Sequence, residues 1–193
     1  MVFFTLLTFL GFVLFLVMIQ IGTLQKKEEA FAAILIKNRT PSLTRMMLFF
    51  TNLGKAAPTI IIGLLLFAFP ATRATIAPQT ATSIFVVSGL AFFIKRIVRR
   101  ERPIDHRLVE EKDHSFPSAH AATSAAMYGT IAMTIGTLVS AAVLPMTLFA
   151  CLLAFLIGFS RVYLGIHFLT DVVGGWLLGA ATAGLVTMLF MHY

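Results

Sequence analysis

Charged residues are scarce in this sequence. They make up 12% of its 193 residues, and only eight of them are acidic, whereas a soluble domain usually has about 25% charged residues. Apolar residues reach 59%, which leaves too little polar surface to cover a globule in water. The composition therefore argues against a soluble domain and predicts one membrane domain over residues 1–193.

Cysteine and internal repeats are lacking as well. Cys151 is the single cysteine, so no intrachain disulfide can form and the cysteine count does not indicate a compartment. No repeat of about 20–50 residues is evident. The shortage of acidic residues leaves a net charge of +7. Because the basic residues lie between apolar runs, we expect anionic lipid or phosphate as the partner, and no nucleic acid.

A basic leader is also missing. The first charged side chain is Lys26, whereas a signal peptide has a basic beginning and a shorter apolar core. The sequence Ala30-Phe31-Ala32 is similar to a cleavage site, but two lysines and two glutamates precede it. We therefore expect the first apolar run to be retained as a span.

Long apolar runs are abundant. A helix needs about 20 apolar residues to cross the hydrocarbon core, and six spans are predicted, at residues 2–24, 56–71, 79–98, 119–139, 143–160 and 168–191. Ser140 and Pro145 mark the turn between the fourth and fifth. The segment 25–55 mixes apolar and charged residues around Pro41 and Gly54, which predicts one or two short interfacial helices. The expected fold class is all-α, an integral membrane bundle of six transmembrane helices with a short amphipathic interfacial segment after the first.

The order of the spans places nearly all charges on one membrane face. The ends of the first, third and fifth spans lie on the same face as the starts of the second, fourth and sixth. On the opposite face we expect only Arg73 and the terminal His192. Polar residues from distant parts of the sequence therefore converge at one surface.

His167 and Asp171 stand at the start of the sixth span. They are four residues apart, so they share one face of a helix. A carboxylate that accepts a hydrogen bond from one ring nitrogen fixes the imidazole tautomer and leaves the other nitrogen free to attack. Asp171 is also the only acidic residue inside a predicted span, where a carboxylate indicates function. A structural His–Asp hydrogen bond, or half of a metal site, would give the same spacing.

Basic residues from two segments are expected beside this pair. Lys95, Arg102 and Arg161 suit an anion pocket, because a planar guanidinium can bond two phosphate oxygens at once. Three neighbours of Lys95 are interpreted instead as interfacial side chains that reach lipid headgroups; they are Arg96, Arg99 and Arg100.

The fourth span begins with Pro117-Ser118-Ala119-His120. A helix N-terminus offers free N–H groups and the positive end of the helix dipole, and both favour phosphate. Ser118 adds a hydroxyl donor, and His120 is placed to protonate a leaving oxygen. The alternative for His120 is an interfacial histidine that meets only water.

These segments resemble the three signature motifs of the type 2 phosphatidic acid phosphatase superfamily. The family pattern is a lysine, six residues and Arg-Pro; then Pro-Ser-Gly-His; then Ser-Arg, five residues, a histidine, three residues and an aspartate. The sequence matches the first and third motifs at every fixed position, as KRIVRRERP and SRVYLGIHFLTD. It matches the second as PSAH, with Ala119 in place of the usual glycine. The layout of spans also resembles the small bacterial members of the phosphatidylglycerophosphatase B type.

The resemblance implies an enzyme, a lipid phosphate phosphatase, with a role for each matched residue. His167 would attack phosphorus and form a phosphohistidine, while Asp171 would orient and charge-stabilise it. His120 would protonate the leaving group and then activate water. The groups expected to hold the phosphoryl oxygens are Lys95, Arg102, Ser118, the Ala119 amide and Arg161. No metal or other cofactor is expected, because these cations take the place of a metal.

The motifs contact only phosphate, so they do not select the lipid. Phosphatidylglycerophosphate or a related lipid phosphate is the expected substrate, and undecaprenyl diphosphate of the cell-wall carrier cycle is the alternative. A non-enzymatic anion transporter or channel would also use cations, but it has no use for the nucleophile His167 and the acid His120. The related vanadate-dependent haloperoxidases are soluble and larger, and the composition argues against that activity.

The expected location is a bacterial-type cell membrane, which the chain crosses several times. Lysine and arginine counts at the span ends favour a cytoplasmic catalytic face, whereas bacterial members of the family generally work on the outer face. We follow the family and expect an extracytoplasmic active site. The loop at 105–114 is interpreted as a solvated charge run, with a lid over the pocket as the alternative. The sequence does not indicate the oligomeric state.

Overall fold

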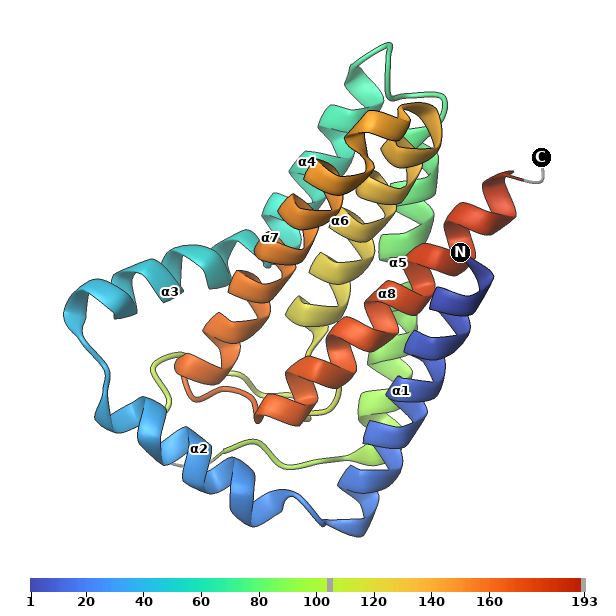
Figure 1. Ribbon diagram of the computed structural model, residues 1–193. Helices are drawn as coiled ribbons and strands as arrows, with labels where there is room; N and C mark the ends of the chain where they lie inside the picture. The colour runs from blue at the N-terminus through green and yellow to red at the C-terminus, as the bar shows by residue number, and fades with distance from the viewer. Residues whose placement is uncertain (104–105, 192–193) are drawn as a thin grey trace.

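The computed structural model describes residues 1–103 and 106–191, and this part of the chain is built from helices without strands (Figure 1). The helices are α1 (Val2–Ile21), α2 (Gln25–Lys37), α3 (Pro41–Leu53), α4 (Ala56–Ala68), α5 (Ile76–Val98), α6 (Ala119–Leu138), the short 3-10 helix η1 (Ser140–Ala142), α7 (Val143–Tyr163) and α8 (Leu169–Met191). The all-α prediction is confirmed, and η1 lies at the turn predicted near Ser140.

The described helices provide four or five candidate membrane spans. Four are long and apolar enough by themselves, namely α1, α5, the run Ser140–Tyr163 that contains α7, and α8. A fifth is obtained if α3 and α4, which are bent by 53° at Gly54 and Lys55, together form one span. The 20 residues of α6 are rich in alanine and threonine, and they are less apolar than the other spans. The predicted count of six therefore stays a prediction.

Small residues let α6 occupy the middle of the bundle. It packs against α5, α7 and α8, and α1 lies along α8. A side-chain carbon at Gly175 of α8 would come within 2.7 Å of the Ser118 carbonyl oxygen, and one at Gly179 would collide with the carbonyl of Ala122. The two backbones can approach this closely only because both positions are glycine. The contact fixes the beginning of α6 against the first turns of α8.

Large apolar side chains cover the outside of the bundle. Phe85 is 81% exposed and Leu144 is 68% exposed, which would be unfavourable in water and is expected against lipid chains. The α1 helix ends at Gly22, whose left-handed conformation (φ 73°) allows its N–H to bond the Ile19 carbonyl. The chain then turns into α2, which lies across one end of the bundle (Figure 1).

The same end of the bundle collects the polar segments. Figure 1 shows α2, the loop after α5 and the starts of α6 and α8 together there, while the turn between α4 and α5 lies at the opposite end. Arg73 belongs to that opposite turn, as predicted. The convergence expected from the order of the spans is confirmed, and His192 lies outside the described residues.

Candidate active site

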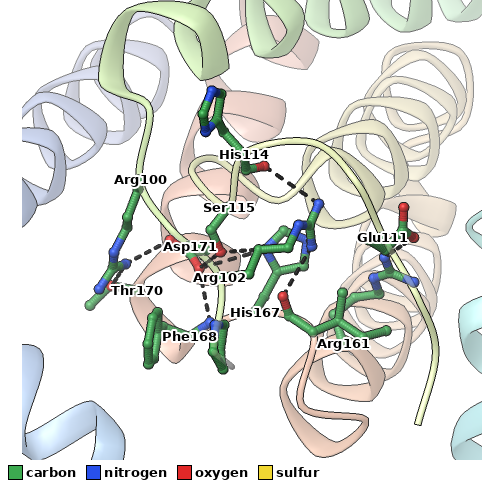
Figure 2. Close-up of polar contacts among 12 residues, drawn as sticks. Arg100, Arg102, Glu111, His114, Ser115, Arg161, His167, Phe168, Thr170 and Asp171 are labelled. Atoms are coloured by element: carbon green, nitrogen blue, oxygen red, sulfur yellow. Dashed lines mark hydrogen bonds and ion pairs between the residues drawn. The ribbon is translucent and has the colours of Figure 1, made fainter. Parts of the chain in front are cut away.

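His167 lies in the short connection between α7 and α8. The chain reverses at Gly165, whose positive φ of 75° suits glycine, and the His167 side chain enters the protein, where it is only 2% exposed. Two side chains contact its ring (Figure 2). A nitrogen of Arg102 lies 3.1 Å from Nε2, and the Ser115 hydroxyl lies 3.2 Å from Nδ1. The ring is therefore held at both nitrogens.

Asp171 is fully buried in the first turn of α8. Its Oδ2 accepts hydrogen bonds from the Phe168 amide at 2.8 Å and from the Ser115 hydroxyl at 2.5 Å. The distance from Oδ2 to Nδ1 of His167 is 3.5 Å, which is longer than a good hydrogen bond. The predicted pair does meet on one side of α8, but the hydroxyl of Ser115 bonds to both members.

The contacts of His167 define its tautomer. The Arg102 guanidinium can only donate, so Nε2 accepts its N–H and Nδ1 carries the proton of the neutral ring. Burial, followed by the positive charges of Arg102 and Arg161, lowers the pKa of His167 well below its ordinary value. The imidazole is therefore neutral at pH 7, and its Nε2 lone pair points toward cations. This is the protonation state that a nitrogen nucleophile needs, and the hydrogen bond from Arg102 to Nε2 must be released before that nitrogen attacks.

Lys95 and Arg102 share one carboxylate in this structure. The Lys95 ammonium lies 2.9 Å from Asp113, and Arg102 also forms an ion pair with Asp113. Partial burial alone would raise the pKa of Asp113, but the hydrogen bonds and charges of Lys95 and Arg102 lower it to about 2. Arg102 is fixed further by the carbonyl of Ile166, 3.0 Å away. The two predicted cations therefore converge on one anion beside His167.

Arg161 makes an equivalent pair a short distance away. Its side chain, from the last turn of α7, donates to Glu111 at 2.5 Å and to the Thr51 hydroxyl of α3 at 2.8 Å. Figure 2 shows the Arg161–Glu111 pair beside the His167 cluster. Glu111 and Asp113 belong to the loop that was interpreted as a solvated charge run. Both residues form ion pairs with site cations, but Asp113 is still 54% exposed, so the interpretation as a solvated charge run stays a prediction. Asp105 of the same loop lies outside the described residues.

The start of α6 supplies the remaining predicted residues. Ser118 is the fully buried N-cap of α6, and its amide donates to the Asp171 carbonyl at 2.9 Å. Ala119 is the first helical residue. Within the described part of the chain, neither the Ser118 hydroxyl nor Nε2 of His120 has a hydrogen-bond partner, so both remain free for a ligand. His120 and Ala119 make no polar side-chain contact with His167 in that part of the structure.

Arg100 corrects the prediction that it reaches lipid headgroups. The α5 helix ends at Val98, and Arg99 adopts a left-handed conformation (φ 51°) that redirects the chain. The Arg100 side chain is only 10% exposed and forms ion pairs of 2.6 Å with Oδ1 of Asp171 and with Glu28. It also stacks over the Phe168 ring at 4.6 Å. Arg99 and Arg96, by contrast, stay partly or fully exposed without an ion pair in the described part.

Glu28 connects α2 to the site, and nothing in the sequence predicted this. It is 6% exposed, and its second oxygen accepts from the Thr170 amide at 2.9 Å and from the Thr170 hydroxyl at 2.5 Å. A carboxylate in this place caps the N-terminus of α8. Ser115, Arg100 and Glu28 therefore complete a polar cluster around Asp171. Their only sequence signal is weak, because each is an ordinary residue of a polar segment.

Comparisons with known proteins show which proteins this chain is similar to. A sequence profile described as the PAP2 superfamily matches residues 79–192. The chain is 34% identical over 179 residues to phosphatidylglycerophosphatase B of Bacillus subtilis. The aligned region covers 89% of this chain and 87% of that protein. It is 30% identical over 149 residues to an undecaprenyl-diphosphatase of Sulfolobus acidocaldarius, covering 74% and 68% of the two chains.

A solved structure agrees with the fold over nearly the whole chain. It is the crystal structure of a transmembrane PAP2-type phosphatidylglycerolphosphate phosphatase from Bacillus subtilis, which superposes with a TM-score of 0.88 at 29% identity. The match covers 98% of this chain and 97% of the other. The similarity thus includes α1 to α4, which lie before the segment that the profile matches.

Proposed function

The chain belongs to the PAP2 superfamily, and on this basis we propose that it removes phosphate from a membrane lipid through a phosphohistidine on His167. The observation that carries the proposal is the state of that residue. His167 is buried and neutral, its Nε2 lone pair is in contact with Arg102, and the residues that hold its other nitrogen are fixed. A lone pair among cations is suited to attack an electrophile that arrives as an anion.

The reaction divides into two steps at this site. In the first, Nε2 of His167 bonds to phosphorus, the bond from phosphorus to the lipid oxygen breaks, and its electron pair stays on that oxygen, which takes a proton from His120. In the second, His120 removes a proton from water, the oxygen of this water bonds to phosphorus, and the P–N bond breaks to restore the lone pair. The first step requires a protonated His120, and the second step restores that proton.

The cations and donors stabilise the charge on the transferring group. Lys95, Arg102 and Arg161 bring three positive charges, and the Ser118 hydroxyl and the Ala119 amide add neutral donors at the start of α6. Phosphoryl transfer depends mainly on such positioning and charge stabilisation. The proposal therefore needs no metal.

Phosphatidylglycerophosphate, or a related lipid phosphate, is the substrate that we propose. Its support is the match to phosphatidylglycerophosphatase B along most of both chains. A cleft of about 750 Å³ lies between α2 and residues 100–103 and is also lined by Phe168, so a headgroup has room beside Arg102, which contacts His167. Undecaprenyl diphosphate is the second candidate, because a relative with 30% identity carries that activity in its name.

A comparison of substrates tests the proposal. Purified protein in detergent with EDTA should release phosphate from phosphatidylglycerophosphate with a higher kcat/KM than from phosphatidate or undecaprenyl diphosphate. The highest kcat/KM on undecaprenyl diphosphate would support the second candidate instead. Release from none of the three lipids would contradict the assignment as a lipid phosphatase, and release that EDTA abolishes would contradict the metal-independent mechanism.

We further propose that six segments cross the membrane and that the site faces the outside. The sixth crossing is α6, whose moderate hydropathy is compatible with its enclosure by α5, α7 and α8. In a Cys151→Ser background, Lys112→Cys in the active-site loop should react with an impermeant thiol reagent in intact cells, and Arg73→Cys should react only after lysis. Both positions are exposed. The reverse pattern would contradict the proposed orientation.

Asp113→Asn is expected to strengthen phosphate binding. The Asp113 carboxylate pairs with Lys95 and Arg102, so a phosphate that uses these cations must displace it. Because the Asp113 side chain is 54% exposed, each pair contributes only about 0.2–1 kcal/mol, and we expect the inhibition constant of inorganic phosphate to fall by up to about fivefold. The measurement is competitive inhibition at pH 7.

Glu110→Gln is the matched control for this change. Glu110 is an exposed acid of the same loop and forms no ion pair within the described residues. It should leave the inhibition constant unchanged. Weaker phosphate binding in Asp113→Asn would show that the carboxylate assists the anion site rather than competing for it.

A further inference from the structure

Ser115 is a buried residue at the centre of the site that none of the three motifs contains. It lies in the loop before α6 with 0% exposure, and its amide donates to the Arg100 carbonyl at 2.8 Å. Its hydroxyl oxygen is 3.2 Å from Nδ1 of His167 and 2.5 Å from Oδ2 of Asp171. The direct distance between these two groups is 3.5 Å. Both contacts of the hydroxyl are therefore shorter than the direct one.

The hydrogen-bond directions around Ser115 leave one consistent arrangement. Arg102 donates to Nε2 of His167, so the ring proton is on Nδ1 and is directed at the Ser115 oxygen. An ionised carboxylate only accepts, so the Ser115 hydrogen is directed at Oδ2 of Asp171. The other carboxylate oxygen, Oδ1, accepts from Arg100. The hydroxyl thus accepts one hydrogen bond, from Nδ1 of His167, and donates one, to Oδ2 of Asp171.

From this geometry we propose that Ser115 is a positioning residue that couples Asp171 to the nucleophile His167. The inference rests on the proposed function and names a residue that acts through the imidazole rather than on the phosphate. When Nε2 bonds to phosphorus, the ring becomes positively charged while its proton stays on Nδ1. The hydrogen bond from Nδ1 to Ser115 then becomes charge-assisted, and the hydroxyl, already polarised by Asp171, stabilises the new charge.

The coupling also holds the ring proton in place. Arg102 keeps the lone pair on Nε2, and the Ser115 oxygen gives the proton on Nδ1 an acceptor. Without the hydroxyl, the acceptor left for Nδ1 within the described residues is Oδ2 at 3.5 Å, so the charge that develops on the ring loses its hydrogen bond. Loss of the hydroxyl should therefore affect the rate of phosphoryl transfer rather than substrate binding.

Ser115→Ala and Ser115→Thr test the proposal. Because the lost hydrogen bond is made to a group that becomes charged, Ser115→Ala should lower kcat by about 10- to 100-fold, with KM changed by less than about twofold. Ser115→Thr keeps the hydroxyl and should recover most of the loss. The matched control is Ser124→Ala. Ser124 is a buried serine whose hydroxyl bonds the Ala121 carbonyl and no other group within the described residues, and the variant should keep the kcat of the unchanged protein.

Nitrogen NMR of His167 gives a readout that does not depend on activity. The unchanged protein should show protonated Nδ1 and unprotonated Nε2, and Ser115→Ala should keep this tautomer but shift the Nδ1 resonance, because the hydrogen bond from Nδ1 is lost. Full kcat in Ser115→Ala, or an unchanged Nδ1 resonance in that variant, would overturn the coupling. Persistence of activity in His167→Ala would instead overturn the proposed function, so the two failures are distinguishable.

Discussion

His167→Ala should release no measurable phosphate from any lipid phosphate. The substitution removes the imidazole nitrogen that contacts Arg102, and alanine supplies no nucleophile in its place. The loss of a nucleophile typically lowers kcat by several orders of magnitude, and we expect at least about 10⁴-fold here. The measurement is phosphate release by purified protein in detergent.

The control for this substitution is His114→Ala. His114 is an exposed histidine of the same loop, and it contributes only its backbone carbonyl to Lys95 and Arg102. Its removal should leave kcat within about twofold, because the carbonyl remains. Activity that survived His167→Ala in a folded protein would remove His167 from its role.

Trapping the intermediate separates a nucleophile from a general base. Acid quenching loses a P–N bond, whereas alkaline quenching preserves it, so the unchanged protein should carry alkali-stable phosphate after brief reaction with labelled substrate. His120→Ala should slow both steps, since the same residue protonates the leaving oxygen and activates water. His167→Ala should carry no label at all.

Local patterns made part of this site predictable from the sequence. His167 and Asp171 are four residues apart, with His167 just before α8 and Asp171 in its first turn, so their separation in sequence alone keeps them close. Lys95 and Ser118 stand next to predicted span ends, so the alternation of crossings was enough to place them on the same face. These inferences needed no knowledge of how the loops run.

Other contacts could not be predicted, because they depend on the path of the loops. Ser115 is 52 residues from His167, and Glu28 is 142 residues from Thr170. Arg100 faces inward because the chain turns at Arg99, directly after α5 ends at Val98. A helix pattern continued through Arg100 points it at lipid headgroups, which was the incorrect expectation.

The interfacial segment and α6 show the same limit. The amphipathic pattern of 25–55 indicated interfacial helices, but not that α3 would join α4 at a bend of 53°. The apolar count alone could not assign α6 either, since a helix enclosed by others is free to use alanine and threonine. In both cases the packing against neighbouring helices, rather than the composition of the helix itself, decides where the helix lies in the bundle.

Arg100→Gln should lower both activity and stability strongly. The guanidinium connects two buried carboxylates, with one nitrogen on Asp171 and the other on Glu28, and its removal leaves both without their cation. Breaking a buried pair costs about 3–5 kcal/mol, and a displaced Asp171 should lower kcat by about 100-fold. The measurements are phosphate release and the thermal unfolding midpoint in detergent.

Further substitutions show whether activity and stability depend on the two-nitrogen geometry of the Arg100 guanidinium or only on its positive charge. Arg100→Lys should be nearly as damaging, because one ammonium cannot occupy both nitrogen positions. Adding Glu28→Gln to Arg100→Gln should recover part of the stability, since one uncompensated carboxylate is removed. Arg96→Gln, at an exposed arginine over the Phe92 ring, should change neither quantity. If Arg100→Gln instead behaved like Arg96→Gln, Arg100 would be a headgroup contact, and Asp171 would be held sufficiently by Ser115 and the Phe168 amide.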